Sequence, residues 1–295
     1  GVTQARSPGR RPPSPRSSGG VSPKLRLRAA AKADRVSPGA AKAAWVVFTD
    51  LDGTLLDSAT YSFGPARPAL RSLRDAGIPL VPCTSKTRAE MEPLRRALGV
   101  EGPAIIENGG GILEADGSLL ALGPAGAQIF RAYDRLKKRA GGVLRAFHEM
   151  SDSELSAETG LSRVEAERAR RREFDIPFAI LGDSSEVEPV LAVAAAKLGL
   201  RITRGGRYFH LHGPTDKGKA LRRVMRRYRG RRAVAIGDSA NDLPMLKAAH
   251  IAFAVMTRSG KHDPDLVGGI SNLRLVDRPG PEGWRIAVER LLEES

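Results

Sequence analysis

The fold of this chain is decided by residues 45–55, which read WVVFTDLDGTL. The first five residues form a short apolar run, which predicts a buried strand. Asp50 and Asp52 come directly after it, and Gly53 permits a sharp turn behind them. An Asp-x-Asp pair alone also occurs in ordinary capped turns, whereas the whole DLDGTL sequence after an apolar strand is far more specific. One carboxylate of such a pair can attack phosphorus, and the other can donate and accept a proton.

Apolar runs alternate with helical patterns on both sides of this stretch. We expect strands at 45–49, 78–81, 104–106, 233–236 and 251–255, and helices at 68–76, 88–98, 219–228, 243–249 and 284–292. Strands that alternate with helices predict a parallel sheet with helices on both faces. The sequence therefore predicts an α/β fold with a Rossmann-like core.

The middle of the chain, residues 124–213, breaks this rhythm. Long helical patterns cover 127–150 and 163–172, and they are followed by apolar runs at 178–181 and 208–211 with a helical pattern at 187–198 between them. This mixture predicts an α+β insertion. We therefore expect a core formed by 45–123 and 214–295, with residues 124–213 inserted as a separate domain.

Three further polar motifs follow expected strands or open an expected helix. They contain Thr84 and Ser85, Lys217, and Asp238 and Asp242 of the sequence GDSAND. Hydroxyls and N–H groups at a helix start can hold a phosphoryl oxygen, a lysine can neutralise phosphate, and carboxylates suit Mg²⁺. Each motif alone is also typical of a helix cap or a solvent-facing side chain. Because reactive groups collect where parallel strands end, we expect these motifs to meet beside Asp50 and Asp52.

In their chain order, these motifs resemble those of the haloacid dehalogenase superfamily of phosphotransferases, and the insertion resembles its C2-type cap. Shorter segments resemble the mannosyl-3-phosphoglycerate phosphatase family, at residues 48–57, 83–91, 107–110, 172–178, 205–210 and 280–284. Many cap-bearing relatives carry Thr-Gly-Arg where this chain has TSKT. The resemblance spans about 45–292 and leaves the N-terminal segment outside.

The resemblance implies the roles of the core residues. Asp50 would be the nucleophile that becomes an aspartyl phosphate, and Asp52 would be the general acid and then the base. Thr84, Ser85 and Lys217 would bind the transferring phosphoryl oxygens.

A Mg²⁺ ion is implied by the same resemblance. Asp50, the backbone carbonyl of Asp52 and Asp238 would hold the ion. Asp242 would support those ligands or the lysine.

The insertion would recognise the remainder of a glycosyl-3-phosphoglycerate. Arg172 and Arg207 can offer forked donors to its carboxylate. Lys86, Glu107 and Asn108 would meet the glycerate or the sugar hydroxyls. The helical pattern before Arg172 is charged throughout, so a solvated helix face is the alternative interpretation of Arg172.

Two histidines and the single cysteine are given structural roles. His210 and His212 share one face of an expected strand, but no third ligand lies near them in sequence, as a zinc site would need. Cys83 is expected to be a small buried residue beside the site.

The composition excludes several classes of protein and indicates a distinct N-terminal segment. The chain has 295 residues and a formal net charge of +15. Residues 1–44 hold 10 Lys and Arg against one acid and are rich in Pro, Ser and Gly, so we expect a disordered basic extension. An organelle transit peptide has the same composition. One cysteine excludes a disulfide scaffold, and no run of about 18 apolar residues exists to form a spanning helix.

The expected function is that of a Mg²⁺-dependent phosphoric monoester hydrolase. By resemblance it would convert mannosyl-3-phosphoglycerate to mannosylglycerate and phosphate in the cytoplasm. The alternatives are the glucosyl analogue or another sugar phosphate. A non-enzymatic alternative, a nucleic-acid-binding or scaffold protein using the basic extension, is disfavoured by the complete set of Asp50, Asp52, Lys217 and Asp238. A small-molecule substrate is expected as the partner, without membrane or nucleic acid.

Overall fold

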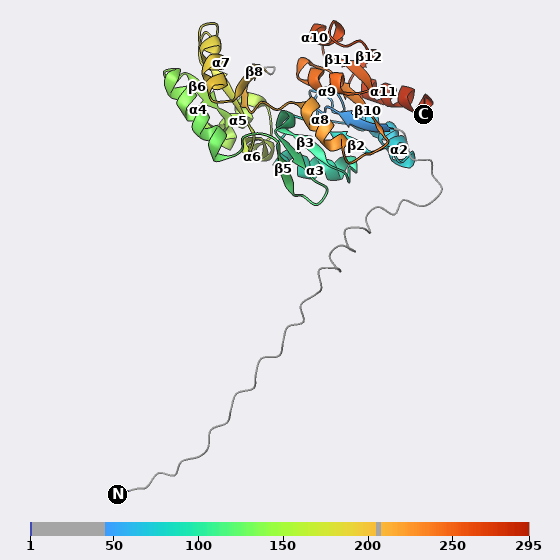
Figure 1. Cartoon of the computed structure of the whole chain (residues 1–295), viewed down its shortest axis with the longest axis horizontal. Helices are drawn as coiled ribbons and strands as arrows, with labels where there is room; N and C mark the ends of the chain where they lie inside the picture. The colour runs from blue at the N-terminus through green and yellow to red at the C-terminus, as the bar shows by residue number, and fades with distance from the viewer. Residues whose placement is uncertain (2–44, 205–207, 295) are drawn as a thin grey trace. The chain divides into compact units, whose positions relative to one another are not determined.

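The computed structural model describes residue 1 and residues 45–204 and 208–294 (Figure 1). Apart from residue 1, the predicted extension at 1–44 therefore lies outside the described residues. The central sheet has five parallel strands in the order β12-β11-β10-β1-β2. Their bounds are β1 Trp45–Thr49, β2 Leu80–Pro82, β10 Arg232–Gly237, β11 Ile251–Met256 and β12 Leu273–Pro279. The predicted α/β core is confirmed.

The strand β1 lies in the interior of this sheet because it is apolar on both faces. All five of its residues are buried. Val47 packs into one hydrophobic cluster, whereas Val46 and Phe48 pack into a second cluster on the opposite face. The alternation places one helical layer on each side of the sheet, which is the arrangement expected for parallel strands joined by helices.

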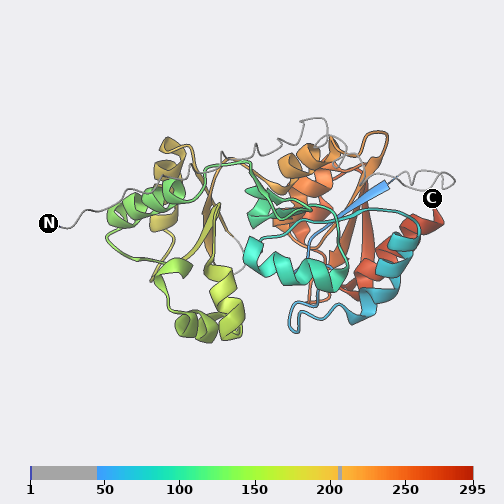
Figure 2. The same ribbon diagram turned by 90° about the horizontal axis from the view of Figure 1, so that it is seen from below.

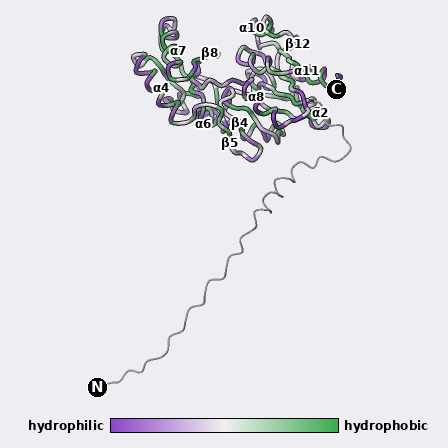
Figure 3. Tube along the Cα trace, in the orientation of Figure 1, coloured by the Kyte–Doolittle hydropathy of each residue, from purple (hydrophilic) through white to green (hydrophobic). Residues whose placement is uncertain are grey.

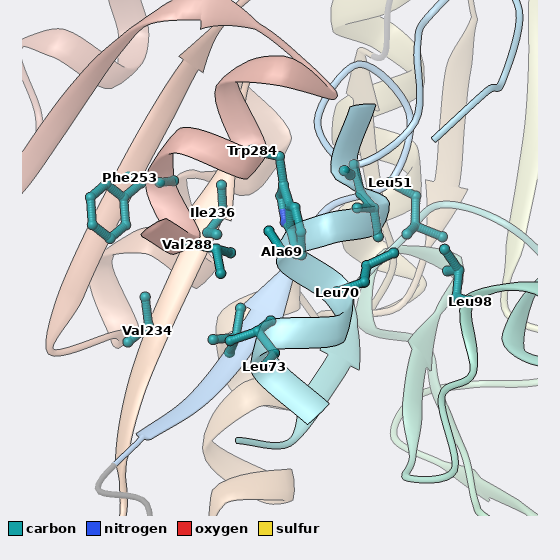
Figure 4. Packing of buried hydrophobic residues seen from close by; sticks show 14 of the residues in the cluster. Leu51, Ala69, Leu70, Leu73, Leu98, Val234, Ile236, Phe253, Trp284 and Val288 are labelled. Atoms are coloured by element: carbon teal, nitrogen blue, oxygen red, sulfur yellow. The ribbon is translucent and has the colours of Figure 1, made fainter. Parts of the chain in front are cut away.

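Helices α2 Arg67–Asp75, α3 Arg88–Leu98 and α11 Glu282–Glu293 contribute to the first cluster, and α8 Lys217–Met225 and α9 Leu243–Ala248 contribute to the second. Figure 4 shows Trp284 of α11 and Leu73 of α2 packed together with Ile236 of the sheet. Figure 3 shows hydrophilic and hydrophobic residues along the same outer helices, as expected when one helix face is buried. A short helix, α10 Pro264–Val267, and two 3₁₀ turns, η1 Gly64–Ala66 and η4 Ala240–Asp242, lie in the connections.

A small antiparallel sheet, β3-β4-β5, extends the core beyond β2. Its strands are β3 Ala104–Ile106, β4 Gly111–Leu113 and β5 Leu119–Ala121, with η2 Glu107–Gly109 between the first two. A single parallel bridge between Cys83 and Ile105 joins β3 to the residue after β2. The sequence predicted β3, but it did not predict this hairpin or β12.

Between these core segments the chain builds a four-stranded antiparallel sheet in the order β6-β7-β9-β8. The strands are β6 Leu144–Ala146, β7 Asp175–Ile180, β8 Arg201–Arg204 and β9 Phe209–His212; the helices are α4 Ala127–Arg139, α5 Asp152–Thr159, α6 Arg163–Arg170 and α7 Val187–Lys197, with η3 Phe147–Glu149. Helices α4 and α7 share a hydrophobic cluster with the sheet, and α5 and α6 share a second cluster with η3. Figure 2 shows the course of these helices and strands from a second direction. We call this inserted region the cap.

The long helix predicted over 127–150 is wrong. Helix α4 ends at Arg139, and Gly141 and Gly142 then adopt φ values of 65° and 85°. Only glycine adopts such values readily, so the two glycines end the helix. The chain returns as strand β6, which pairs with β7. The helix predicted over 163–172 also ends early, at Arg170.

Among the residues described, no helix has the length and apolar character needed to cross a lipid bilayer.

Candidate active site

Asp50 lies at the carboxyl end of β1, and its backbone continues the hydrogen bonding between β1 and β10. Its N–H donates to the carbonyl of Ile236 at the end of β10, at 2.9 Å. The hydroxyl of the preceding Thr49 donates to the Asp50 carbonyl at 2.7 Å, and the indole Nε1 of Trp284 donates to that hydroxyl at 2.9 Å. Helix α11 therefore buttresses the backbone that presents the Asp50 carboxylate.

Lys217 lies between two carboxylates at the start of α8. Its Nζ is 2.6 Å from Asp50 Oδ1 and 2.7 Å from Asp242 Oδ1, and its side chain is 1% exposed. Burial alone would lower the pKa of Lys217, but Asp242 and Asp50 raise it above its ordinary value. Burial, together with the neighbouring Asp242, raises the pKa of Asp50 well above the usual range. The lysine is therefore a fixed buried cation that offsets part of this negative charge.

A third acid, Asp238, completes a carboxylate cluster with these two. Oxygen atoms of Asp50, Asp238 and Asp242 lie within 4.8 Å of one another. Thr54 Oγ1 donates to Asp238 Oδ1 at 3.0 Å, and burial followed by Asp242 raises the pKa of Asp238 to about 7. Gly53 has φ of 83°, and a Cβ there would lie 2.7 Å from Asp238 Oδ2, so the turn and the acid need a glycine at this position.

The donor set of this cluster fits a hard divalent cation. The three acids offer only oxygen ligands, and the one lysine among them balances only one of their charges. Burial raises the pKa of Asp50 and Asp238 most, and the neighbouring carboxylates raise it further; a cation bound among them would favour the ionised forms.

Asp52 faces a different environment from Asp50. Its side chain is 36% exposed, and its Oδ1 lies 2.9 Å from Lys86 Nζ. Lys86 also lies 3.9 Å from Glu90 and over the ring of Tyr61. These residues line a cavity of about 390 Å³ between core and cap. The Asp50 carboxylate thus lies in the carboxylate cluster, and the Asp52 carboxylate lines the cavity beside it.

Thr84 and Ser85 follow β2 at the same edge of the sheet. Thr84 is fully buried, and its Oγ1 accepts a hydrogen bond from the Lys86 N–H at 3.1 Å. Ser85 lines both the cavity that contains Asp52 and a neighbouring cavity of about 360 Å³ that contains Lys217. The structure therefore brings Ser85 between the two parts of the site.

Glu107 was predicted to bind the substrate, but its carboxylate contacts backbone groups of the protein. It is 1% exposed, and its two carboxylate oxygens accept the backbone N–H groups of residues 173–175 at 2.8 to 3.1 Å. Burial raises its pKa to about 7, although Arg172 and the Phe174 N–H oppose this. Glu107 instead fastens the start of β7 to the core.

Arg172 is neither on a solvated helix face nor free. Its side chain is 8% exposed, and it donates to the carbonyls of Ala169 at 3.0 Å and Ser85 at 2.7 Å. Asn108 lines the 360 Å³ cavity, and its Nδ2 donates to Asp175 at 3.4 Å. Arg207 falls outside the described residues.

The sequence did not predict a functional role for three residues near the site, which are Thr54, Asp175 and His210. Thr54 donates to Asp238, and its place in the DLDGTL motif, two residues after Asp52, is the sequence signal that could have indicated this role. Asp175 is fully buried and binds the ring of His210, which lines both cavities. No local pattern singles out this pair, because its members lie 35 residues apart.

Comparison with known proteins agrees with this geometry. The family model of haloacid dehalogenase-like hydrolases matches residues 47–154 and 194–260. A glucosyl-3-phosphoglycerate/mannosyl-3-phosphoglycerate phosphatase of Methanococcoides burtonii is 37% identical over 85% of this chain and 98% of its own length. A protein of the same description from Persephonella marina is 34% identical over 84% of this chain and 97% of its own length.

A solved structure shares the fold. A phosphatase of the same superfamily from Bacteroides thetaiotaomicron, BT1666, has a TM-score of 0.64 at 22% identity, covering 87% of this chain and 98% of its own. The cluster at the end of β1 and β10, the inserted antiparallel cap and the match along most of the chain lead to one assignment. The chain belongs to the haloacid dehalogenase superfamily, as a phosphatase among its hydrolases.

Proposed function

We propose that the chain hydrolyses the phosphate ester of a glycosyl-3-phosphoglycerate, with the mannosyl compound as the leading substrate and the glucosyl compound as the alternative. The observation that carries this proposal is the 37% identity over 98% of a relative with that described activity. The buried Asp50–Lys217–Asp242 group beside a polar cavity agrees with it.

In the first step, the carboxylate of Asp50 attacks phosphorus, and the bond from phosphorus to the glycerate oxygen breaks. Asp52 gives its proton to that leaving oxygen, so the alcohol departs neutral. The product on the protein is an aspartyl phosphate at Asp50. The different surroundings of the two acids support this division, because Asp52 lines the cavity where a leaving group would sit.

In the second step, water attacks the phosphorus of the aspartyl phosphate. Asp52, now ionised, takes a proton from the water, and the bond between phosphorus and the Asp50 carboxylate breaks. Inorganic phosphate leaves, and both carboxylates return to their starting states. Asp52 thus acts as a general acid in the first step, when it loses a proton, and as a general base in the second step, when it regains one from water.

Lys217 and the two hydroxyl residues Thr84 and Ser85 bind the transferring phosphoryl oxygens in this proposal. Negative charge spreads over those oxygens in the transition state, and a cation fixed in advance stabilises it. Lys217 meets that requirement, because Asp50 and Asp242 already hold its Nζ in place.

Mg²⁺ is the proposed ion at the carboxylate cluster. Asp50, Asp238 and the backbone carbonyl of Asp52 would hold it, and Asp242 would support Lys217 and the backbone N–H groups of residues 238 and 239. When bound, the ion neutralises charge on the phosphoryl group.

The decisive experiment measures phosphate release from mannosyl- and glucosyl-3-phosphoglycerate, from mannose 6-phosphate and from p-nitrophenyl phosphate, with and without Mg²⁺. We expect the highest kcat/KM for one of the glycosyl phosphoglycerates, and only with the ion. A sugar monophosphate as the best substrate would instead identify a sugar phosphatase, and the proposal would be wrong.

A further inference from the structure

The imidazole of His210 is held in one orientation by a buried carboxylate. Its Nδ1 donates to Asp175 Oδ2 at 2.8 Å, and Asp175 is 0% exposed. Asp175 also lies 3.4 Å from Asn108 Nδ2 and 3.7 Å from the Arg172 guanidinium, so it cannot move with the ring. A hydrogen bond at one ring nitrogen fixes which nitrogen faces elsewhere. The Nε2 edge of His210 is therefore the edge available to a ligand.

His210 also occupies a central position over the site. It lines the 390 Å³ cavity together with Asp52 and Lys86, and it lines the 360 Å³ cavity together with Lys217. Its side chain is 16% exposed. The ring comes from strand β9 of the cap, so a substrate held at the core would meet it from the cap side.

The other basic groups of the 390 Å³ cavity are already engaged. Lys86 pairs with Asp52 and Glu90, and Arg172 donates to two backbone carbonyls. In the described part of the chain, no residue forms a hydrogen bond with His210 Nε2. Lys86 keeps the carboxylate of Glu90 as a neighbour at 3.9 Å even when Asp52 carries the proton for the leaving group, so a second anionic group entering this cavity finds its free partner at His210.

We infer that His210, carrying protons at both ring nitrogens, donates Nε2–H to the carboxylate of the phosphoglycerate while Nδ1–H stays on Asp175, and that this pair selects for substrates carrying that acid. The inference rests on the proposed function. In a 3-phosphoglycerate the carboxylate is separated from the ester-bearing carbon by one carbon atom. The acid must therefore lie close to the leaving oxygen, and hence to Asp52, in the cavity that His210 lines.

The experiment compares wild type, His210→Ala and His210→Gln on two esters. One is the preferred glycosyl-3-phosphoglycerate, and the other is its analogue with a hydroxymethyl group in place of the carboxylate. We expect kcat/KM to fall about 10- to 100-fold for the acid, the scale of a lost hydrogen bond to a charged group, and less than about 3-fold for the analogue. His148→Gln is the matched control, because His148 is a cap histidine packed edge-on against Phe130 and Tyr133. It should change neither value.

Equal losses on both esters, in variants with a wild-type circular dichroism spectrum, would overturn the inference, and so would no loss on the acid. If both variants fail to fold, wild type supplies the test through inhibition of p-nitrophenyl phosphate hydrolysis. Glycosylglycerate should then inhibit at least about 10-fold more strongly than glycosylglycerol, and equal inhibition would refute the role. Absence of any turnover of glycosyl-3-phosphoglycerate by wild type would refute the proposed function itself, and the inference with it.

Discussion

The guanidinium of Arg172 donates a 2.7 Å hydrogen bond to the backbone carbonyl of Ser85, which lies 87 positions earlier in the chain. The contact joins the cap to the loop that carries the expected phosphate-binding hydroxyls. Two neighbouring contacts cross the same boundary: Glu107 accepts the backbone N–H groups at 173–175, and Thr87 donates to the Arg168 carbonyl at 2.9 Å. The cap is thus attached to the core by buried polar groups at the edge of the active site.

Replacing Arg172 with alanine should lower stability and activity together. The change removes two hydrogen bonds from a charged, 8% exposed donor, so the free energy of unfolding should fall by about 2–4 kcal/mol. Because the contact positions Ser85, kcat/KM should fall by similar factors for a glycosyl phosphoglycerate and for p-nitrophenyl phosphate. Urea unfolding and the two assays check this. A loss confined to the carboxylate-bearing substrate would instead support the role in substrate binding that the sequence predicts for Arg172.

Replacing Asp50 with asparagine should abolish turnover without unfolding the chain. An amide cannot form the acyl phosphate, so phosphate release should fall by a factor on the order of 10³ or more. Asp52→Asn should retain the nucleophile and lose the proton transfer, a fall of about 10²- to 10⁴-fold in kcat. Incubation with substrate and acid quenching should trap phosphate on wild type and none on Asp50→Asn. Near-normal phosphate release by Asp50→Asn would contradict the mechanism.

Mg²⁺ should stabilise the chelator-treated protein through the carboxylate cluster. At about 100 times its dissociation constant, an ion that binds only the folded state adds about 2.7 kcal/mol to the free energy of unfolding. Asp238→Asn should lose most of this gain. Without the ion it should be no less stable than wild type, because it removes one of three crowded carboxylates. Asp75→Asn, at the exposed end of α2, should keep the full gain and serves as the control. Equal stabilisation of wild type and Asp238→Asn would place the ion elsewhere.

Acid should destabilise the cap through Asp175. Burial alone would raise the pKa of this group, but His210 and Arg172 lower it to about 2, below the ordinary value of 3.8. A carboxyl with a lowered pKa in the folded state stabilises the fold above its unfolded pKa, and that contribution is lost as pH falls from about 4 toward 2. The contribution amounts to about 2 kcal/mol. Urea unfolding at pH 5 and pH 3 should therefore show a smaller loss of stability for Asp175→Asn than for wild type. An equal loss in both proteins would mean that other groups cause the acid transition.

The sequence by itself determined the core and the position of its reactive edge. Buried strands such as 45–49 are recognisable from a few adjacent residues, and Asp50, Lys217, Asp238 and Asp242 all follow a strand or open a helix. Parallel strands end at a common edge, so local signals were enough to predict that these side chains meet. The acidic cluster and the Lys217 ion pairs agree with that expectation.

The tertiary structure alone decided which polar side chains line the cavities and which of them bind other parts of the protein. Sequence reasoning placed Glu107 and Arg172 among the substrate groups and gave His210 a structural role. In the fold, Glu107 accepts backbone N–H groups, Arg172 donates to backbone carbonyls at the wall of the 390 Å³ cavity, and His210 lines both cavities. The physical reason is that burying a charged or polar side chain costs free energy unless hydrogen bonds or ion pairs offset the loss of its hydration. The partner of His210 lies 35 positions away on the neighbouring cap strand, and the core–cap partners of Glu107 and Arg172 lie 67 and 87 positions away, so only the tertiary packing brings these groups together.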